Sequence, residues 1–398
     1  MKPNSQSDLS RRAFLRGLGA ATAAAATARA AEPVIPGFEK QATDPNASKG
    51  WKPVTDRKLR VGIVGYGYCR FGAAFGFQHH PNVEVVAVSD LIPERCAGLA
   101  TACKCAKTYP SLEELVKDDR IEAVFVATDA PSHARHCIEV LKHGKHVATA
   151  VPAVFGSLED ADALFAAVKQ SGLKYMMFET SCYRDELAAM RQIYRAGGFG
   201  KIVYAEGEYF HWHKEPLPSF KEWRTGLPPQ WYPTHSNAYF VGVTGGRFTE
   251  VSCMGMPSEL KFLQAANNRY QNPFGTEIAL FRTTEGGSAR MAVSWDTPGY
   301  DGEMGRVRGQ KGSYYKDFVG LQRKPPDVRR PPLPPGVEAG GHGGSHGHLM
   351  NEFVTAIFEN REPLVNIAWA LNMTVAGIVA HQSALKDGEL LKIPAYTL

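Results

Sequence analysis

The 398-residue sequence has little cysteine, little net charge and no long hydrophobic run, and each shortage excludes a class of protein. Its seven cysteines are odd in number and show no regular spacing, so they do not form the framework of a disulfide-stabilised secreted domain. Cys103 and Cys105 have no second pair of ligands nearby in the sequence, and we expect no zinc there. The apolar run in residues 1–30 is too short, and too poor in Leu and Ile, to make a stable membrane anchor.

The formal net charge of +5 is concentrated at the N-terminus. Residues 1–30 hold a surplus of four positive charges, which leaves the rest of the chain near +1. So small a surplus gives no reason to expect nucleic acid or an anionic membrane as a partner. A content of 44% hydrophobic and 21% charged residues is typical of a soluble globular protein, and the length suits two domains.

The first 30 residues have the parts of an export signal. The pair Arg11-Arg12 precedes Phe14 and Leu15, a Gly/Ala/Thr-rich stretch follows, and residues 28–30 form a small-x-small cleavage site. Paired arginines indicate the twin-arginine (Tat) route, which carries folded proteins, so we expect the Tat machinery as a partner and a periplasmic or otherwise exported product. A disordered basic tail is the alternative. Residues 31–57, rich in Pro, Gly, Ala and Lys, are predicted to be a linker or arm.

Residues 58–180 predict a nucleotide-binding domain of alternating strands and helices. Short apolar strands are expected at 59–64, 83–89, 121–127, 146–148 and 175–178, with helices at 93–102, 111–117, 132–143 and 157–170. Alternation of this length implies a parallel sheet covered on both faces.

Residues 181–398 predict a second domain for substrate binding, because the rhythm changes. A helix at 185–195 is followed by longer strand-like runs at 201–209, 248–254, 276–283 and 289–295, as in an antiparallel or mixed sheet. Two helices, at 349–360 and 367–386, close the chain. The Pro/Gly-rich stretch 324–347 is too long for a simple turn and is predicted to be a functional loop.

The first predicted strand runs directly into a glycine-rich turn that predicts a dinucleotide site. The first glycine permits the tight turn, and the second lets the backbone approach a pyrophosphate. The sixth position, usually Gly or Ala, is an arginine. The turn consists of Gly65, Tyr66, Gly67, Tyr68, Cys69 and Arg70.

Asp90 ends the second predicted strand. An acid at this place accepts hydrogen bonds from the adenosine ribose and repels a 2′-phosphate, which favours NAD over NADP. The alternative is an aspartate that only caps the helix beginning near Pro93.

Two further segments carry a family resemblance. The segment Thr128–His133 and the segment Gly144-Lys-His-Val147, together with the turn and acid above, resemble the Gfo/Idh/MocA oxidoreductases over roughly residues 58–398. The resemblance implies an α/β protein with an N-terminal Rossmann domain and a C-terminal α/β domain carrying a large open, mostly antiparallel sheet. In this family that sheet often mediates homo-oligomers. The resemblance also implies cofactor contacts at Thr128, His133 and residues 150–151.

One departure from the family concerns catalysis. The family usually has Glu-Lys-Pro after the fourth strand, with the lysine beside the nicotinamide. This chain has Ala150, Val151 and Pro152 at that place. The usual role of the lysine therefore does not carry over.

The second domain is similar to a particular branch, the NAD-dependent α-N-acetylgalactosaminidases of this superfamily. The similarity lies in Glu179-Thr-Ser-Cys-Tyr-Arg184, Tyr232-Pro-Thr-His235 and Gly340-Gly-His-Gly-Gly344. It implies that Tyr183 and His235 lie at the active site. After residue 344 those glycosidases usually continue with Met-Asp, whereas this chain continues with Ser-His.

Removing hydride from a sugar carbinol needs a base for the hydroxyl proton, and histidine titrates near working pH. We therefore predict His235 as the base and Tyr183 as its proton partner or orienting group. The alternatives are a histidine that caps a loop and a tyrosine that packs the domain junction. The predicted substrate contacts are Arg184, Trp223, Arg224, Tyr232 and His342, although large aromatics also serve core packing.

Two histidine-rich segments have open interpretations. His342, His346 and His348 lie on the Gly-rich stretch; no positioned carboxylate or cysteine accompanies them, so we expect a substrate-lining or solvated loop and no metal. His211 and His213 flank Trp212 at a strand end, as a sugar-stacking site or plain sheet surface.

These observations predict an exported oxidoreductase that acts on a sugar or sugar derivative with tightly bound NAD. The alternative is a redox-neutral NAD-dependent glycosidase, in which oxidation, elimination, hydration and re-reduction follow one another without the two carboxylates of ordinary glycosidases. A third hypothesis is a non-catalytic, NAD-containing sugar-binding protein.

Overall fold

The computed structural model describes residues 49–321 and 326–398. These residues belong to one compact unit. The predicted export signal, and the predicted arm as far as residue 48, lie outside the described residues. None of the helices in the described part of the chain is long and apolar enough to cross a membrane.

The first sheet is a six-stranded parallel sheet in the order β3-β2-β1-β4-β5-β6. The chain leaves strand β1 for β2 on one side, then crosses to β4 on the other. This Rossmann arrangement confirms the predicted fold of the N-terminal part. The strands are β1 (Leu59–Val64), β2 (Val83–Ser89), β3 (Thr108–Tyr109), β4 (Ala123–Val126), β5 (His146–Thr149) and β6 (Tyr175–Met177).

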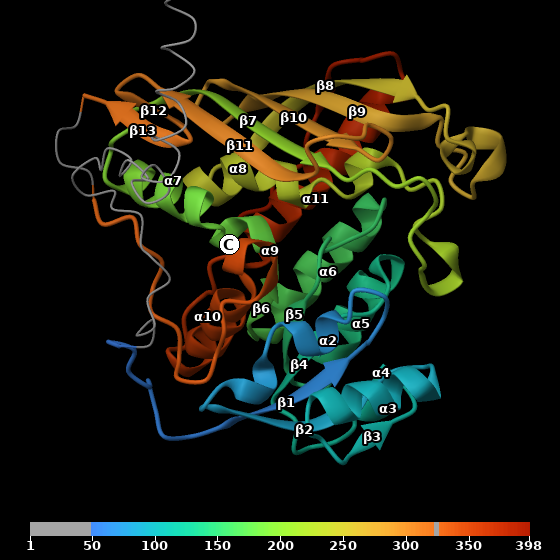
Figure 1. The fold of residues 1–398 in the computed structure, drawn as a ribbon, viewed down its shortest axis with the longest axis vertical. Coiled ribbons are helices and arrows are strands. Elements are labelled where there is room, and N and C mark those ends of the chain that lie inside the picture. The colour runs from blue at the N-terminus through green and yellow to red at the C-terminus, as the bar shows by residue number, and fades with distance from the viewer. Residues whose placement is uncertain (1–48, 322–325) are drawn as a thin grey trace, which may run out of the picture. The chain divides into compact units, whose positions relative to one another are not determined.

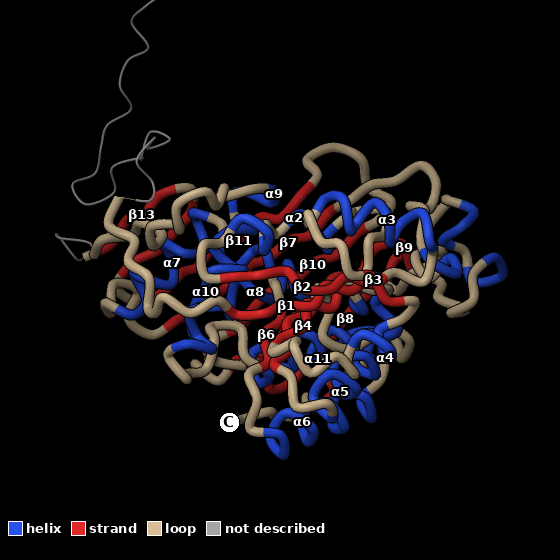
Figure 2. Tube along the Cα trace, turned by 90° about the horizontal axis from the view of Figure 1, so that it is seen from below, coloured by secondary structure: helices blue, strands red, loops and turns tan. Residues whose placement is uncertain are grey.

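Helices cover this sheet because its central strands are apolar on both faces. All four residues of β4 are buried, and β1 exposes only Arg60. Figure 2 shows the helices beside the strands, with α5 and α6 next to each other. The covering helices are α3 (Pro93–Ala102), α4 (Leu112–Leu115), α5 (His133–Lys142) and α6 (Leu158–Ser171).

The second sheet has eight strands in the order β13-β12-β11-β7-β10-β9-β8-β14. Its pairs are antiparallel except β7 with β10, so the prediction of a mostly antiparallel sheet is confirmed. The strands are β7 (Ile202–Phe210), β8 (Phe248–Pro257), β9 (Phe274–Thr283), β10 (Ser288–Ser294), β11 (Gly302–Gly309), β12 (Gly312–Tyr315), β13 (Asp317–Gly320) and β14 (Leu391–Lys392).

One face of this sheet is covered by helices and the other is open. Helices α7 (Asp185–Arg195), α8 (Thr234–Thr244) and α11 (Ile367–Ala384) lie on the covered side, as Figure 1 shows. Helix α8 approaches β7 so closely that a Cβ on Gly207 would lie 2.1 Å from the Ser236 carbonyl oxygen. On the open face Met254, Leu280 and Met304 keep 61%, 55% and 47% of their surface exposed.

Candidate active site

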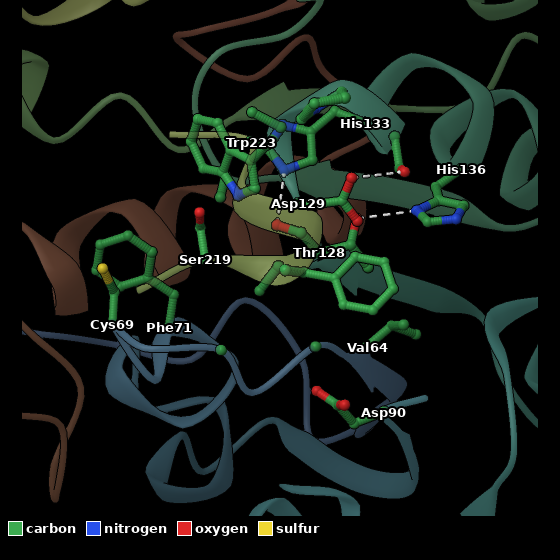
Figure 3. Close-up of a pocket in the computed structure, with 18 of the residues that line it drawn as sticks. Val64, Cys69, Phe71, Asp90, Thr128, Asp129, His133, His136, Ser219 and Trp223 are labelled. Carbon is green, nitrogen blue, oxygen red and sulfur yellow. Dashed lines mark hydrogen bonds between the residues drawn. The ribbon is translucent and has the colours of Figure 1, made fainter. Parts of the chain in front are cut away.

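A cleft of about 390 Å³ lies at the carboxyl ends of β1, β2, β4 and β5. Ligands of open parallel sheets bind at this edge. In Figure 3, Cys69 and Asp90 belong to the first turns of the Rossmann domain, Asp129 and His133 to the turn after β4, and Trp223 to a facing segment of the second domain. The cleft therefore joins the two parts of the chain.

The glycine-rich turn has the shape that a pyrophosphate needs. Gly65 has φ +101°, and a Cβ there would lie 2.2 Å from the Ala127 carbonyl oxygen. A Cβ on Gly67 would have no atom within 4 Å, so this backbone borders the open cleft. A Cβ on Gly72 would lie 2.3 Å from the Gly65 carbonyl oxygen. Gly72 thus has the close-packing role that the usual spacing would give to position 70, because Arg70 takes a left-handed conformation and helix α2 (Phe71–Ala74) begins after it.

The two glycines of the turn allow a matched pair of variants. Gly65→Ala is expected to cost on the order of 2–4 kcal/mol of unfolding free energy, because it adds both a backbone strain and an overlap. Gly67→Ala should fold like the wild type and bind NAD about tenfold or more weakly, since its methyl group enters the cleft. Thermal unfolding and calorimetric NAD titration measure the two effects. Equal NAD affinity in Gly67→Ala and the wild type would contradict the assignment.

Asp90 is fixed by the backbone at the end of β2. Its Oδ2 accepts from the Tyr66 N–H at 2.7 Å, and its Oδ1 accepts from the Ile92 N–H at 2.9 Å. Both bonds are local, and neither caps helix α3, whose N-cap is Ile92 without a side-chain hydrogen bond. The carboxylate nevertheless borders the cleft and retains lone pairs for the two hydroxyls of a ribose.

The turn after β4 is fastened to the turn after β5 by His133, while His136 holds the Thr128 side chain. His133 Nδ1 lies 2.7 Å from the Pro152 carbonyl oxygen, and its Nε2 lies 3.2 Å from the Thr128 carbonyl oxygen. His136 Nδ1 lies 2.9 Å from the Thr128 hydroxyl. The Val151–Pro152 peptide bond is cis. His133 is buried, so it shapes the wall of the cleft at the place where the family's lysine is replaced by Val151.

Nearly all of the predicted cofactor residues border the cleft. The exception is Tyr66, whose ring lies beneath the Arg70 guanidinium while its backbone N–H holds Asp90. The predicted residues that line the cleft are Gly65, Gly67, Tyr68, Cys69, Arg70, Asp90, Thr128, His133, Ala150 and Val151.

His235 belongs to a buried charged cluster with two carboxylates. It lies on the first turn of α8, and its Nδ1 donates to Glu179 Oε1 at 2.7 Å and lies 3.8 Å from Glu303 Oε1. Glu179 is fully buried and follows β6, whereas Glu303 lies on β11 and accepts from the Ser181 hydroxyl at 2.8 Å. Arg184 approaches Glu303 to 3.5 Å.

Two carboxylates around one imidazole determine its protonation. Burial would lower the pKa of His235, but Glu179 and then Glu303 outweigh burial and raise the pKa to about 9. Burial alone would raise the pKa of Glu179, yet the His235 cation keeps it below its ordinary value. At neutral pH His235 is therefore an imidazolium and a proton donor. The base role predicted from the sequence belongs to the neutral imidazole, above about pH 9.

Tyr183, predicted as the proton partner or orienting group of His235, has its ring contacts with other residues. Its ring stacks on His348 at 6.0 Å between centroids and lies beneath the Arg191 guanidinium, and burial raises its pKa well above the ordinary value. The ring that contacts His235 edge-on is that of Tyr209, at 4.6 Å. Among the described residues, Tyr183 has no hydrogen bond or ring contact with His235, and its role as proton partner or orienting group stays a prediction.

Three of the predicted substrate residues form the wall that faces the nucleotide turn. Trp223 and Tyr232 stack at 6.3 Å between ring centroids, and the Arg224 guanidinium lies over both rings, at 4.3 and 5.6 Å. The Tyr232 ring lies 5.7 Å from the His235 ring, so this wall leads from the cleft to the buried cluster.

The other two predicted substrate residues lie outside the cleft lining. Arg184 Nε donates to Glu186 at 2.7 Å. His342 has a left-handed backbone, lies 2.9 Å from His346 Nε2 and packs on Phe71, next to the nucleotide turn. In the part of the chain that the structure describes, no group of three or more His, Cys, Asp or Glu side chains could hold a metal ion.

Several site residues were not predicted from the sequence, and only some of them had a recognisable signal in it. Tyr209 lies on β7 two residues before His211, and their ring centroids are 5.7 Å apart, so the alternation of side chains was its signal in the sequence. Glu179 opens the motif that was noted for its tyrosine. Glu303 had no signal, because β11 begins at a glycine-rich segment without an apolar pattern.

Comparison with known families agrees with this geometry. Residues 59–179 match the Gfo/Idh/MocA model, described as the oxidoreductase family with an NAD-binding Rossmann fold. Over these residues the chain is similar to that family. The predictions of a Rossmann domain and of NAD as its cofactor are thereby confirmed, and the open cleft beside Gly67 fits a dinucleotide.

Relatives similar in sequence are glycosyl hydrolase family 109 proteins. One from Bacteroides fragilis is 31% identical over 176 residues, which cover 42% of this chain and 38% of that protein. The match thus spans less than two thirds of the length of this and the other most similar relatives. Another, from Shewanella pealeana, is 24% identical over 98% of this chain and 96% of its own.

Similar solved structures are sugar and inositol dehydrogenases. Levoglucosan dehydrogenase in complex with NADH has a TM-score of 0.69 at 18% identity, covering 85% of this chain and 100% of that one. The apo scyllo-inositol dehydrogenase from Lactobacillus casei has a TM-score of 0.66 at 15% identity, covering 85% and 99%. At these identities the likeness concerns the fold.

Proposed function

We propose that this protein is an NAD-dependent oxidoreductase that acts on a sugar or sugar derivative by hydride transfer to or from a bound nicotinamide. One observation carries the proposal. The wall of Trp223, Arg224 and Tyr232 borders the dinucleotide cleft on one side and contacts His235 on the other. A sugar stacked on this wall would lie between a hydride carrier and a proton-transfer group.

Different residues of the chain have different roles in such a reaction. NAD, when bound, supplies the hydride chemistry. Asp90 and the glycine-rich turn hold and orient the dinucleotide, while the aromatic wall presents a flat surface to the sugar. His235 gives its Nε2 proton to a carbonyl oxygen of the sugar as that carbonyl is reduced. The neutral imidazole takes the hydroxyl proton in the reverse reaction.

The second candidate is the redox-neutral glycosidase. It is supported by the glycosyl hydrolase family 109 relatives, which include one matched along nearly the full chain. Val151 in place of the family's lysine supports it as well. In this reaction the imidazolium of His235 would also protonate the departing group.

Export, tight cofactor binding and oligomer formation belong to the same proposal. The Arg11-Arg12 pair supports Tat export, and a Tat passenger that folds before export would carry its NAD with it. The exposed Met254, Leu280 and Met304 on the open sheet support a homo-oligomer. Cell fractionation and light scattering measure these two properties.

The test of function begins with protein purified in its folded form. After denaturation we expect about one NAD per chain, and no nitrophenol from nitrophenyl glycosides incubated with the native protein. Free sugars or sugar acids should then reduce the bound NAD or an added acceptor. Release of nitrophenol without added cofactor would favour the glycosidase instead. Bound NAD without turnover of any sugar would favour the non-catalytic hypothesis, and no NAD, even on addition, would contradict all three.

A further inference from the structure

We propose that the substrate is a sugar acid and that Arg224 binds its carboxylate. The inference rests on the proposed function, because it names the class of sugar that the cleft accepts. It depends on how Arg224 is held, on what it is not paired with, and on the charges that surround it.

Aromatic rings, and not a carboxylate, hold the Arg224 guanidinium in place. The guanidinium lies 4.3 Å from the Trp223 ring centroid and 5.6 Å from that of Tyr232. Trp223 is itself fixed, because its carbonyl accepts from the Tyr270 hydroxyl at 2.6 Å and its ring meets Phe155 edge-on. The guanidinium is thus pre-positioned, so ligand binding costs little additional side-chain entropy.

In the described part of the chain, Arg224 has no acidic partner, in contrast to Arg290 and Arg330 of the second domain. Arg290 is paired with Glu206 and Glu208, and Arg330 with Asp185. Within residues 49–321 and 326–398, no Asp or Glu oxygen lies within 4.0 Å of the Arg224 nitrogens. A half-buried guanidinium stacked on rings keeps N–H donors in the geometry that suits a planar carboxylate.

The second-domain side of the cleft has charge of one sign. Its charged lining residues are Lys221, Arg224 and Arg269, whereas the acidic lining residues Asp90, Glu113 and Asp129 belong to the Rossmann side. The dinucleotide phosphates belong beside Gly67, on that same Rossmann side. The second-domain wall therefore has a positive charge that the cofactor does not neutralise, and an anionic substrate would do so.

Neutral histidines complete the binding surface. Arg224 also borders a small cavity lined by His211, His213 and Trp295. Burial, and then the neighbouring His213, lower the pKa of His211 to about 4, so this ring is neutral at pH 7. It can donate a hydrogen bond to a carboxylate or hydroxyl without adding charge. A ring oxygen or hydroxyl on the aromatic wall and a carboxylate on Arg224 would fix a sugar acid at two points.

The experiment compares matched pairs of acid and neutral sugar on the NAD-loaded protein. Calorimetry is carried out with galacturonate against galactose and glucuronate against glucose. We expect one acid to bind about 10- to 100-fold more tightly than its neutral partner, as a charge-assisted hydrogen bond implies. Arg224→Met should weaken acid binding about 10- to 100-fold, so that the acid binds no more tightly than its neutral partner, and should leave the NAD content unchanged. Arg57→Met is the control, because Arg57 also lies over an aromatic ring, Phe358, but lines no part of the cleft.

Several results would overturn the inference. Equal binding of acid and neutral sugars by the wild type would do so without any variant, as would an acid preference that survives in Arg224→Met. Loss of NAD from Arg224→Met would assign the arginine to the cofactor phosphates instead. If Arg224→Met does not fold, Arg224→Lys keeps the charge and should lose about fivefold or more of the acid preference, because the planar fork is gone. Oxidation of neutral sugars alone would uphold the proposed function and contradict this inference. Binding of acids without turnover would uphold the acid site at Arg224 and contradict the proposed function.

Discussion

Replacing His235 with asparagine is expected to lower kcat about 10²- to 10⁴-fold, the usual contribution of a general acid or base. The asparagine amide keeps a donor near the position of Nδ1, so Glu179 retains a partner and the fold should persist. What is lost is the second ring nitrogen, which exchanges the proton with the sugar. The measurement is the initial rate of NADH formation or consumption with the substrate found by the sugar screen.

The matched control is His381→Asn. His381 Nδ1 also lies 2.7 Å from a fully buried glutamate, Glu277, and it lines no part of the cleft. This control should keep the wild-type kcat, and both variants should carry NAD. A His235→Asn enzyme with kcat within twofold of the wild type would remove His235 from the reaction.

Replacing Glu179 with glutamine is expected to shift the pH dependence of the reaction by about one unit or more toward acid. In the wild type, sugar reduction should fall and sugar oxidation should rise as the pH passes through about 9, because His235 loses its proton there. Without the Glu179 charge, only Glu303 opposes the effect of burial, so the pKa of the His235 imidazole falls. Rates measured in both directions from pH 5 to 10 show the shift, whereas a purely structural role would lower them without moving the midpoint.

Stability provides an independent readout of the same pair. The pKa of His235 is raised in the folded protein, so the ion pair of His235 with Glu179 contributes its full stabilisation of the fold below about pH 6.5. This contribution is lost as the pH rises through about 9. The Tm of the wild type should therefore fall as the pH rises over this interval, and the fall should be smaller in Glu179→Gln. Identical pH dependence of rate and stability in the two proteins would contradict the charged pair.

The Rossmann half of the fold was predictable because its signals are local. Strands such as β1 and β2 are short apolar runs bounded by turn residues, and both begin and end where the pattern placed them. Helix α3 begins at Pro93, a residue favoured at the first helical position. The glycine turn and Asp90 follow from the same pattern, since a dinucleotide demands close backbone approach at a strand end.

Helix α8, which carries His235, was not predictable in the same way. Ten of its eleven residues are buried between the sheet and neighbouring helices, so it has no polar face and no amphipathic period. Strands β11, β12 and β13 were missed for the opposite reason. They contain glycine and are partly exposed, and β12 and β13 have only four residues each, so their pairing partners supply the order that their residues do not encode.

The sequence by itself determined the nucleotide domain, its cofactor and the residue types available for chemistry. Only the tertiary structure decided which of them meet. It brought Glu179, His235 and Glu303 together from three elements, and it placed Tyr209 beside His235 while Tyr183 packs on His348. Local patterns encode backbone conformation, whereas the protonation of a buried histidine depends on charges more than fifty residues away in the chain.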